Sequence, residues 1–402
     1  MKKVISVILT SAMVLSLMAC GGNAGGNAGS SVAASSESSA QSSESSAGEN
    51  GEANAPADYS FNFRVGSGLS TQHPYDTGFY TPLMEAITAD TGGQVTFDYF
   101  HTGELVAYGS EYEALSQGIV DMAASFTPTY DASRFPLTEI IALPAIGVDQ
   151  ITMNTAAYNL FHSTETVGDT GKTYYELMFT DKDLVGFISF SVGEYYLLTT
   201  GHSFNKLEDF NPTVTMRSPS RPVTLLLENL NLTPITLVSS EQYDAMSRGT
   251  IQGITLCATW CDNGLEDLIK YVLKSFPLSY YTYFTMTTDT WNSLPEELQN
   301  YFIEESDRLF FEGWQDMVDY SETNFAALGD DCVIEDISEL DPEVQQFINE
   351  AVAQTWKDWI DSVEQQGYEG KAIALMYRDE LIKAGATLDQ TLMELDDYVP
   401  NK

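Results

Sequence analysis

The stretch YEALSQGIVD (residues 112–121) returns later in the chain as YDAMSRGTIQ (residues 243–252). Tyrosine, alanine, serine and glycine occupy the same positions in both copies, and two further positions carry conservative exchanges. In each copy a short helical segment runs into a glycine, Gly118 or Gly249, which favours a left-handed helix end followed by a strand. Two unrelated junctions would explain the shared glycine and alanine, but they explain the tyrosine and serine in the same register less well. The repeat therefore predicts two similar α/β units.

The residues before the first copy follow the same rhythm. Residues 61–65 alternate apolar and polar side chains, as a half-buried strand does. Residues 80–93 carry apolar side chains at helical spacing and end in two glycines, and residues 94–100 are typical of a second strand. Ser110 and Glu113 match a capping box at the start of the first-copy helix. Short connections between such elements predict an α/β unit with a mostly parallel sheet.

A segment late in the chain predicts a long helical element. Residues 294–328 have no proline after the first turn and carry an apolar stripe, so they form either one helix of roughly 50 Å or two helices that break at Gly313. Such a length can run across both units. We therefore expect an α/β protein of two lobes with a ligand cleft between them. Lobe I is expected to comprise residues 58–190 with 280–320, and lobe II residues 191–279 with 321–402.

The first residues predict export. Residues 1–19 combine two lysines, an apolar run and small residues, which is typical of a signal peptide and too short for a spanning helix. The residues LMAC that end at Cys20 resemble a bacterial lipobox, in which the cysteine receives the lipid; the alternative is an ordinary signal peptide with a coincidental cysteine. Residues 20–57 are rich in Gly, Ser and Ala and predict a flexible tether. We expect an extracytoplasmic protein that is lipid-anchored to the outer face of the cell membrane, or periplasmic.

Composition disfavours several classes of function. The formal net charge of −40 becomes −42 without the two lysines of residues 1–19, which disfavours nucleic acid as a partner. The sequence contains no nucleophile elbow, zinc-protease motif, phosphate loop or dinucleotide-binding glycine motif, so nothing in it indicates an enzyme or a cofactor. No histidine neighbours Cys257 and Cys261, which disfavours a metal site. A small anion must be held by a local cation, because charges beyond about 8 Å are screened.

Arginine can supply this cation, and the chain has only seven arginines. Arg217 ends the run TVTMR and precedes Ser218 and Pro219, which stop the strand. At a strand end between two lobes, its planar fork suits a carboxylate. From spacing alone, a structural salt bridge to one of the 58 acidic residues is an equally good explanation. Arg221 is a weaker candidate for the same role.

Several longer pieces together resemble one family. They are TGGQVTFDYFHTGELV, EALSQGIVDMAAS, FPLTEIIALPAIG, TVTMRSP, LNLTPITLVSSEQYDAMSRGTIQGI and WNSLPEELQNYF, and they cover most of residues 58–328. The chain resembles the solute-binding subunit of the tripartite ATP-independent periplasmic (TRAP) transporters, the DctP-type family. This resemblance implies a two-lobed periplasmic-binding-protein-like fold with a long helix spanning both lobes, without enzymatic activity. It also implies capture of a small organic acid and its delivery to the small and large permease subunits in the membrane.

The same resemblance makes Arg217 the carboxylate-binding residue. Many members carry a second arginine upstream, where this chain has Glu194 and Tyr195, so a monocarboxylate with an apolar or aromatic body is expected instead of a dicarboxylate. The residues predicted to line the site beside Arg217 and Arg221 are Tyr195, Trp260, Phe126, Ser67, Gln72 and His73. Core packing is the alternative for the three aromatic residues, and loop capping for the other three. The alternative functions are a sensory binding subunit for a membrane receptor and a surface enzyme acting on small acids.

Overall fold

The computed structural model of the chain describes residues 59–237, 241–276 and 278–401. The predicted signal peptide, the lipidation site Cys20 and the predicted tether lie outside the described residues. Within the described ranges, no helix is both long enough and apolar enough to cross a bilayer.

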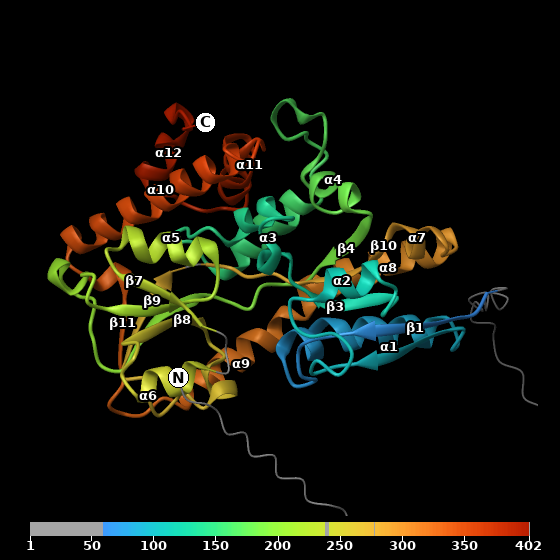
Figure 1. Ribbon diagram of the computed structural model, residues 1–402, viewed down its shortest axis with the longest axis horizontal. Coiled ribbons are helices and arrows are strands. Elements are labelled where there is room, and N and C mark those ends of the chain that lie inside the picture. Colours follow the sequence, from blue (N-terminus) through green and yellow to red (C-terminus); the bar gives the residue numbers. More distant parts are fainter. Residues whose placement is uncertain (1–58, 238–240, 277, 402) are drawn as a thin grey trace, which may run out of the picture. The chain divides into compact units, whose positions relative to one another are not determined.

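Five strands form the first sheet, in the order β2-β1-β3-β10-β4 (Figure 1). They are β1 (Phe61–Gly66), β2 (Val95–Phe100), β3 (Met122–Phe126), β4 (Leu184–Ile188) and β10 (Tyr283–Thr287). β1 and β2 lie where the alternating pattern predicts them. β1 pairs in parallel with β2 and β3, whereas β10 runs antiparallel between β3 and β4. Four strands of this sheet therefore run in the same direction, as the predicted mostly parallel sheet requires, and β10 alone, a strand from late in the chain, enters in the opposite direction.

Six strands form the second sheet, in the order β11-β9-β5-β8-β6-β7. They are β5 (Tyr195–Thr199), β6 (Thr215–Ser218), β7 (Thr233–Thr236), β8 (Gly253–Cys257), β9 (Tyr271–Phe276) and β11 (Val333–Asp336). β6 pairs in parallel with β7 and β8, and β9 pairs in parallel with β11. β5 runs antiparallel between β8 and β9. The chain thus leaves the first sheet after β4, builds most of the second sheet, and returns to the first sheet as β10.

The two copies of the repeat take the same local structure. α2 (Glu111–Ser116) is followed by Gly118 at φ +66° and then β3, and α6 (Gln242–Ser247) is followed by Gly249 at φ +67° and then β8. This left-handed conformation turns the chain from helix to strand and is easily adopted only by glycine. The predicted helix, glycine and strand order is confirmed in both copies. The capping box is not formed, because the Ser110 side chain makes no capping hydrogen bond and Glu113 pairs with Arg134 instead.

The predicted long helix is two helices, α8 (Glu296–Glu312) and α9 (Trp314–Ala326), which break at Gly313. A Cβ atom at Gly313 would lie 1.9 Å from the carbonyl oxygen of Gly78, in the π-helix Asp76–Tyr80. Two glycines are therefore required where these backbones meet. α8 packs against the helix that precedes β2 and against β4, whereas α9 places Phe325 on the ring of Tyr196 at a centroid distance of 5.3 Å. The helix pair thus contacts both sheets.

The remaining α-helices cover the sheets. They are α1 (Thr81–Asp90), α3 (Gln150–Phe161), α4 (Tyr174–Met178), α5 (Arg221–Asn229), α7 (Thr288–Asn292), α10 (Pro342–Glu364), α11 (Gly370–Lys383) and α12 (Gln390–Met393). α11 packs on α3 and α10 packs on α5, so the C-terminal helices join elements that precede and follow the change of sheet (Figure 1). Trp356 of α10 is fully buried and donates a hydrogen bond of 2.7 Å to the carbonyl oxygen of Pro144. The buried apolar residues form one continuous core.

Candidate functional site

Arg217 is a buried cation near the end of β6. Its side chain is only 4% exposed. Its Nε donates a hydrogen bond of 3.2 Å to the carbonyl oxygen of Leu237, and its Nη1 donates one of 3.5 Å to that of Thr255. No carboxylate of the described residues lies within ion-pair distance of its guanidinium. Burial lowers the pKa of Arg217 from its ordinary value, because a charge without a counter-ion is poorly solvated there.

The other six arginines all form ion pairs with carboxylates. These pairs join Arg64 to Asp121, Arg134 to Glu113 and Asp131, Arg221 to Glu139, Arg248 to Asp244, Arg308 to Glu305 and Glu312, and Arg378 to Asp379 and Asp396. Arg217 therefore differs from every other arginine of the chain. A buried guanidinium without a carboxylate is costly unless a ligand supplies the missing charge.

Tyrosines lie near this cation. The positive charge of Arg217 is close enough to Tyr195 and Tyr130 to oppose the rise in the pKa of both phenols, and Tyr280 acts in turn on the pKa of Arg217. The ring of Tyr130 lies 5.3 Å from that of Tyr108 at 73° and 6.3 Å from that of Tyr280 at 60°. Thr129 donates a hydrogen bond of 2.9 Å to the Tyr280 hydroxyl. The near-perpendicular rings give the site aromatic faces in several orientations.

The ionisation of these tyrosines is suppressed. Burial raises the pKa of Tyr195 and Tyr280 well above the ordinary value. The phenols therefore stay neutral and keep a proton to donate to an anion. Burial also raises the pKa of the neighbouring Cys257 to about 11, so its thiol is neutral too.

Both sheets contribute to this group, which we call the Arg217 cluster: Arg217, Tyr195 and Cys257 from the second sheet, with Tyr75, Tyr108, Tyr130 and Tyr280 from segments that adjoin the first. Tyr75 donates a hydrogen bond of 2.6 Å to the carbonyl oxygen of Tyr280. Tyr108 and Tyr130 are 38% and 48% exposed, whereas Tyr75 is buried. The cluster thus has a closed floor around Arg217 and an exposed side formed by two tyrosines.

Ser125 is a strained residue that holds the loop after β1 beside the Arg217 cluster. Ser125, in β3, has φ +65°, which is costly for a residue with a side chain. Its Oγ accepts a hydrogen bond of 3.1 Å from the backbone N–H of Gly68, and Ser67 Oγ lies 3.1 Å from it. A Cβ atom at Gly68 would lie 2.5 Å from the Cβ atom of Tyr108. The fully buried Ser67 therefore fixes the loop after β1 against Tyr108.

Two of the predicted lining residues lie in the hydrophobic core. Trp260 is fully buried, packs edge-on against Phe325 at 4.9 Å, and donates its indole N–H to the carbonyl oxygen of Asn324 at 3.0 Å. Phe126 is 2% exposed and packs edge-on against Phe135 at 5.5 Å. Both rings pack against core neighbours, and their place in the ligand site stays a prediction.

Arg221 is engaged in a structural ion pair. Its guanidinium bonds to one carboxylate oxygen of Glu139, which is completely buried and also accepts a hydrogen bond of 3.1 Å from the indole N–H of Trp359. Burial raises the pKa of Glu139, and the bonds from Arg221 and Trp359 oppose that shift. Arg221 is therefore needed to neutralise Glu139, and we do not include it in the site.

The loop residues His73 and Gln72 differ in their solvent exposure. The Nδ1 of His73 accepts a hydrogen bond of 3.2 Å from the backbone N–H of Tyr75, and the imidazole stacks on the Tyr75 ring at 5.1 Å. Burial lowers the pKa of His73 to about 4, so the ring is neutral at physiological pH. Gln72 is exposed. His73 thus packs against Tyr75, a residue of the Arg217 cluster.

Most of the tyrosines were not predicted from the sequence. Tyr108 precedes the first copy of the repeat, Tyr130 follows β3, and Tyr280 precedes β10, so they come from three separate loops. The available signal was the local enrichment of tyrosine in YGSEYEA, TPTYD and LSYYTYF. The described residues contain no group of His, Cys, Asp and Glu side chains arranged to hold a metal ion.

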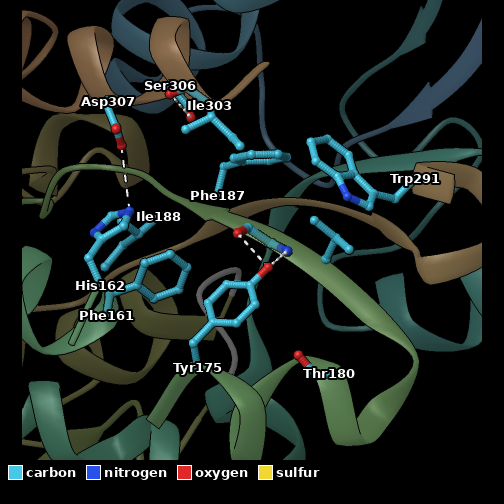
Figure 2. Close-up of a pocket in the computed structure, with 12 residues that line it drawn as sticks. Phe161, His162, Tyr175, Thr180, Phe187, Ile188, Trp291, Ile303, Ser306 and Asp307 are labelled. Carbon is cyan, nitrogen blue, oxygen red and sulfur yellow. Dashed lines mark hydrogen bonds and ion pairs between the residues drawn. The ribbon is translucent and has the colours of Figure 1, made fainter. Parts of the chain in front are cut away.

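A separate pocket of about 380 Å³ lies along the edge strand β4. Figure 2 shows that the Tyr175 hydroxyl points at the strand backbone, where it accepts from the Gly186 N–H at 3.1 Å, and that His162 points at Asp307, with 3.5 Å between Nε2 and Oδ1. None of the residues lining this pocket belongs to the Arg217 cluster. We therefore build the ligand site on Arg217 and not on this pocket.

The chain matches a known protein family over most of its length. The model of the DctP family, described as "Bacterial extracellular solute-binding protein, family 7", matches residues 65–368. That match spans most of both sheets, including Arg217 and every tyrosine of the cluster.

Similar solved structures share the fold. A TRAP solute-binding protein from Rhodoferax ferrireducens T118, in complex with copurified benzoate, gives a TM-score of 0.66 at 17% identity over 81% of this chain and 98% of that chain. A marine metagenome TRAP solute-binding protein specific for aromatic acid ligands, with 3-hydroxybenzoate, gives 0.66 at 19% identity over 82% and 100%. A TRAP periplasmic solute-binding protein from Desulfovibrio desulfuricans, with bound sn-glycerol-3-phosphate, gives 0.67 at 15% identity over 82% and 99%. The predicted two-lobed α/β fold is confirmed by these similarities.

Proposed function

Because the chain belongs to the bacterial extracellular solute-binding proteins of family 7, the solute-binding subunits of TRAP transporters, we propose that it captures a small monocarboxylate at Arg217. Members of this family are binding proteins and not enzymes. The observation that carries the proposal is the buried guanidinium of Arg217, which has no carboxylate partner among the described residues. A ligand carboxylate supplies that partner, and the bidentate geometry of the pair favours a planar anion.

The balance of charge at the site favours one carboxylate over two. Among residues 59–237, 241–276 and 278–401, Arg217 is the single arginine without an ion pair, so no second unpaired arginine of this part of the chain can hold another carboxylate. At the upstream position where many members have a second arginine, the chain has Glu194 and Tyr195. Burial raises the pKa of Glu194. A carboxyl group carries no positive charge, so Glu194 cannot replace the second arginine as an anion-binding group. The site therefore suits a monocarboxylate.

The tyrosines favour an aromatic or apolar ligand body. Tyr108, Tyr130 and Tyr280 present rings at steep angles to one another, and such rings bind a flat ligand by edge-on and stacked contacts. Two structurally similar proteins bind benzoate and 3-hydroxybenzoate, although one similar protein binds sn-glycerol-3-phosphate. We therefore place an aromatic or otherwise apolar monocarboxylate first among ligands for this chain.

The two sheets are proposed to lie in the two lobes that close on this ligand. The strands of the first sheet fall within residues 58–190 and 280–320, and those of the second within residues 191–279 and 321–402. A lipid at Cys20 is proposed to anchor the chain outside the cytoplasm, with residues 20–57 as the tether. The loaded protein then delivers the acid to the membrane subunits of the transporter.

Native mass spectrometry of freshly purified protein tests the proposal by identifying a retained small acid. The same acid is then titrated calorimetrically into the wild type and into Arg217→Met. We expect binding to the wild type and a loss of at least about a hundredfold in the variant. A retained solute without a carboxylate, or equal affinity in both proteins, contradicts the proposal. Copurification of permease subunits from the host membrane supports transport, whereas copurification of a receptor kinase supports sensing.

A further inference from the structure

Glu111 is a buried carboxyl group on the first-sheet side of the Arg217 cluster. It is the first residue of α2 and is 1% exposed. Its Oε1 accepts a hydrogen bond of 3.0 Å from the backbone N–H of Gly109. No cationic side chain of the described residues pairs with it, although Glu113, one half-turn further along the same helix, pairs with Arg134 at 3.0 Å. Glu111 is thus a buried acid that lacks a cation, as Arg217 is a buried cation that lacks an acid.

Packing connects the two groups through one ring. A Cβ atom at Gly109 would lie 3.5 to 3.6 Å from Tyr130, so the glycine that binds the Glu111 carboxyl also lies against the Tyr130 side chain. The charge of Glu111 raises the pKa of Tyr130 and of Tyr108, and the charge of Arg217 lowers that of Tyr130, so both charged groups lie near Tyr130. Tyr130 thus lies near both Glu111, on the helix before β3, and Arg217, on β6.

The surroundings of Glu111 suit a cation. Tyr108 and Tyr130 lie at 73° to one another and are partly exposed, so their ring faces are accessible beside the carboxyl group. Aromatic faces attract ammonium groups, and a nearby carboxylate adds a charge-assisted hydrogen bond. Burial of the Glu111 carboxyl group makes its hydrogen bond to a cation stronger than it is in water.

The repeat shows that the fold does not require an acid at this position. Gln242 occupies the equivalent place in the second copy, directly before the tyrosine of YDAMSRGTIQ, and it is fully buried as well. The helix, glycine and strand junction forms there with an amide. The negative charge is therefore specific to the copy that adjoins Tyr108 and Tyr130, which points to a role in the site.

We propose that the ligand is zwitterionic: Arg217 binds its carboxylate, while Glu111 and the Tyr108 and Tyr130 rings bind an ammonium group at its other end. This inference rests on the proposed function and narrows the ligand to amino-carboxylates whose two charges are held apart by an apolar or aromatic spacer. The spacer is needed because Glu111 lies on the helix before β3 of the first sheet, whereas Arg217 lies on β6 of the second.

The protonation state of Glu111 determines how the affinity for a ligand changes with pH. Burial raises the pKa of this carboxyl group to about 7. The ionisable groups that face it are Glu113 on its own helix, Tyr108 before the helix, and Tyr130 in the turn Pro128–Asp131. An ammonium ligand favours the ionised carboxylate, so its affinity rises as the pH is raised from 6 to 8. A plain carboxylate ligand is repelled by the ionised group, so its affinity falls over the same range.

Two probes of equal size test the proposal in the full chain: 4-(aminomethyl)benzoate and 4-ethylbenzoate, titrated calorimetrically at pH 6 and pH 8. In the wild type at pH 8 we expect the amino probe to bind about tenfold or more tightly than the ethyl probe. Glu111→Gln should bring this ratio close to one. Glu104→Gln, which removes an exposed acid from the loop before Tyr108, should leave the ratio unchanged. Arg217→Met should weaken both probes.

Equal or tighter binding of the ethyl probe by the wild type overturns the proposal. An amino-probe affinity that falls with rising pH in the wild type does so as well, and this measurement does not depend on whether Glu111→Gln folds. If neither probe binds to the wild type, the zwitterion assignment is overturned as well. The proposed function fails separately, when the acid retained by the purified protein binds Arg217→Met as well as it binds the wild type.

Discussion

Replacing Arg217 with methionine removes the guanidinium while keeping a side chain of similar length. In the unliganded protein the variant loses two long hydrogen bonds, of 3.2 and 3.5 Å, to the carbonyl oxygens of Leu237 and Thr255. Each such bond contributes about 0.5 to 1.5 kcal/mol. The variant also loses a buried charge without a counter-ion, which is a gain. Because the two effects oppose one another, we expect the free energy of unfolding without ligand to change by less than about 2 kcal/mol.

The effect on the liganded protein is much larger. Removing one partner of a buried ion pair costs about 3 to 5 kcal/mol, since the other charge stays buried without its partner. At about 1.4 kcal/mol per factor of ten, this weakens the ligand by roughly two to three and a half powers of ten. Arg217→Lys keeps the charge without the planar fork and should lie between the wild type and Arg217→Met.

Thermal unfolding with and without ligand measures both effects. A ligand at a hundred times its dissociation constant stabilises the wild type by about 2.7 kcal/mol. At the same concentration, a variant that binds a hundredfold more weakly gains only about 0.4 kcal/mol. If Arg217→Met keeps the ligand stabilisation of the wild type, the guanidinium does not hold the ligand. If the unliganded variant is destabilised as strongly as a core truncation, Arg217 has a structural role instead.

Three further substitutions test other parts of the structure. Arg221→Met leaves Glu139 buried without its cation, and we expect a loss of about 3 kcal/mol in the free energy of unfolding measured with urea, with unchanged ligand affinity; weaker ligand binding would return Arg221 to the site. Gly313→Ala places a Cβ atom 1.9 Å from the Gly78 carbonyl oxygen, so its free energy of unfolding should fall by about 2 kcal/mol or more, and an unchanged urea midpoint would contradict the contact. His73→Gln tests a pH dependence. Burial lowers the pKa of His73 to about 4, so as the pH falls the unfolded chain binds a proton at this residue before the folded chain does. The free energy of unfolding of the wild type therefore decreases as the pH falls from 6.5 to 4. This loss is at most about 3 kcal/mol, and urea titrations across that range should show a smaller loss in the variant.

Local sequence signals predicted the elements that local interactions decide. The alternation of residues 61–65 and the glycines that stop α1 and α2 correctly located β1, α1 and the repeated junctions. The break between α8 and α9 remained open, because Gly313 has an ordinary helical φ of −71° and its need for glycine comes from Gly78 in a distant segment. The capping box failed for a similar reason, since Arg134 competes for Glu113.

Only one residue of the candidate site carried a signal in the sequence. Arg217 stands at a strand end before Ser218 and Pro219, where spacing left a structural salt bridge as an equally good explanation, and the resemblance to the DctP-type family favoured ligand binding. Arg221 was retained because its partner Glu139 lies far away in the sequence. Trp260 and Phe126 were chosen as large aromatic residues, yet aromatic side chains of this size more often fill a core. The tyrosines and Glu111 are brought together by the meeting of separate loops, which sequence spacing does not encode.

The position of β10 also determines the order in which the chain can fold. Tyr283 of β10 pairs with Phe126 of β3 and with Ile188 of β4, so the first sheet has a gap until nearly three quarters of the chain is available. Until then β3 and β4 present open edges, and closing such a long loop is slow. A chain made from its N-terminus onward therefore stays incompletely folded while the strands from β5 to β9 are added. Delayed closure of the sheet exposes the chain to aggregation. It also keeps the chain unfolded for longer, which suits a protein that is expected to cross a membrane before it folds.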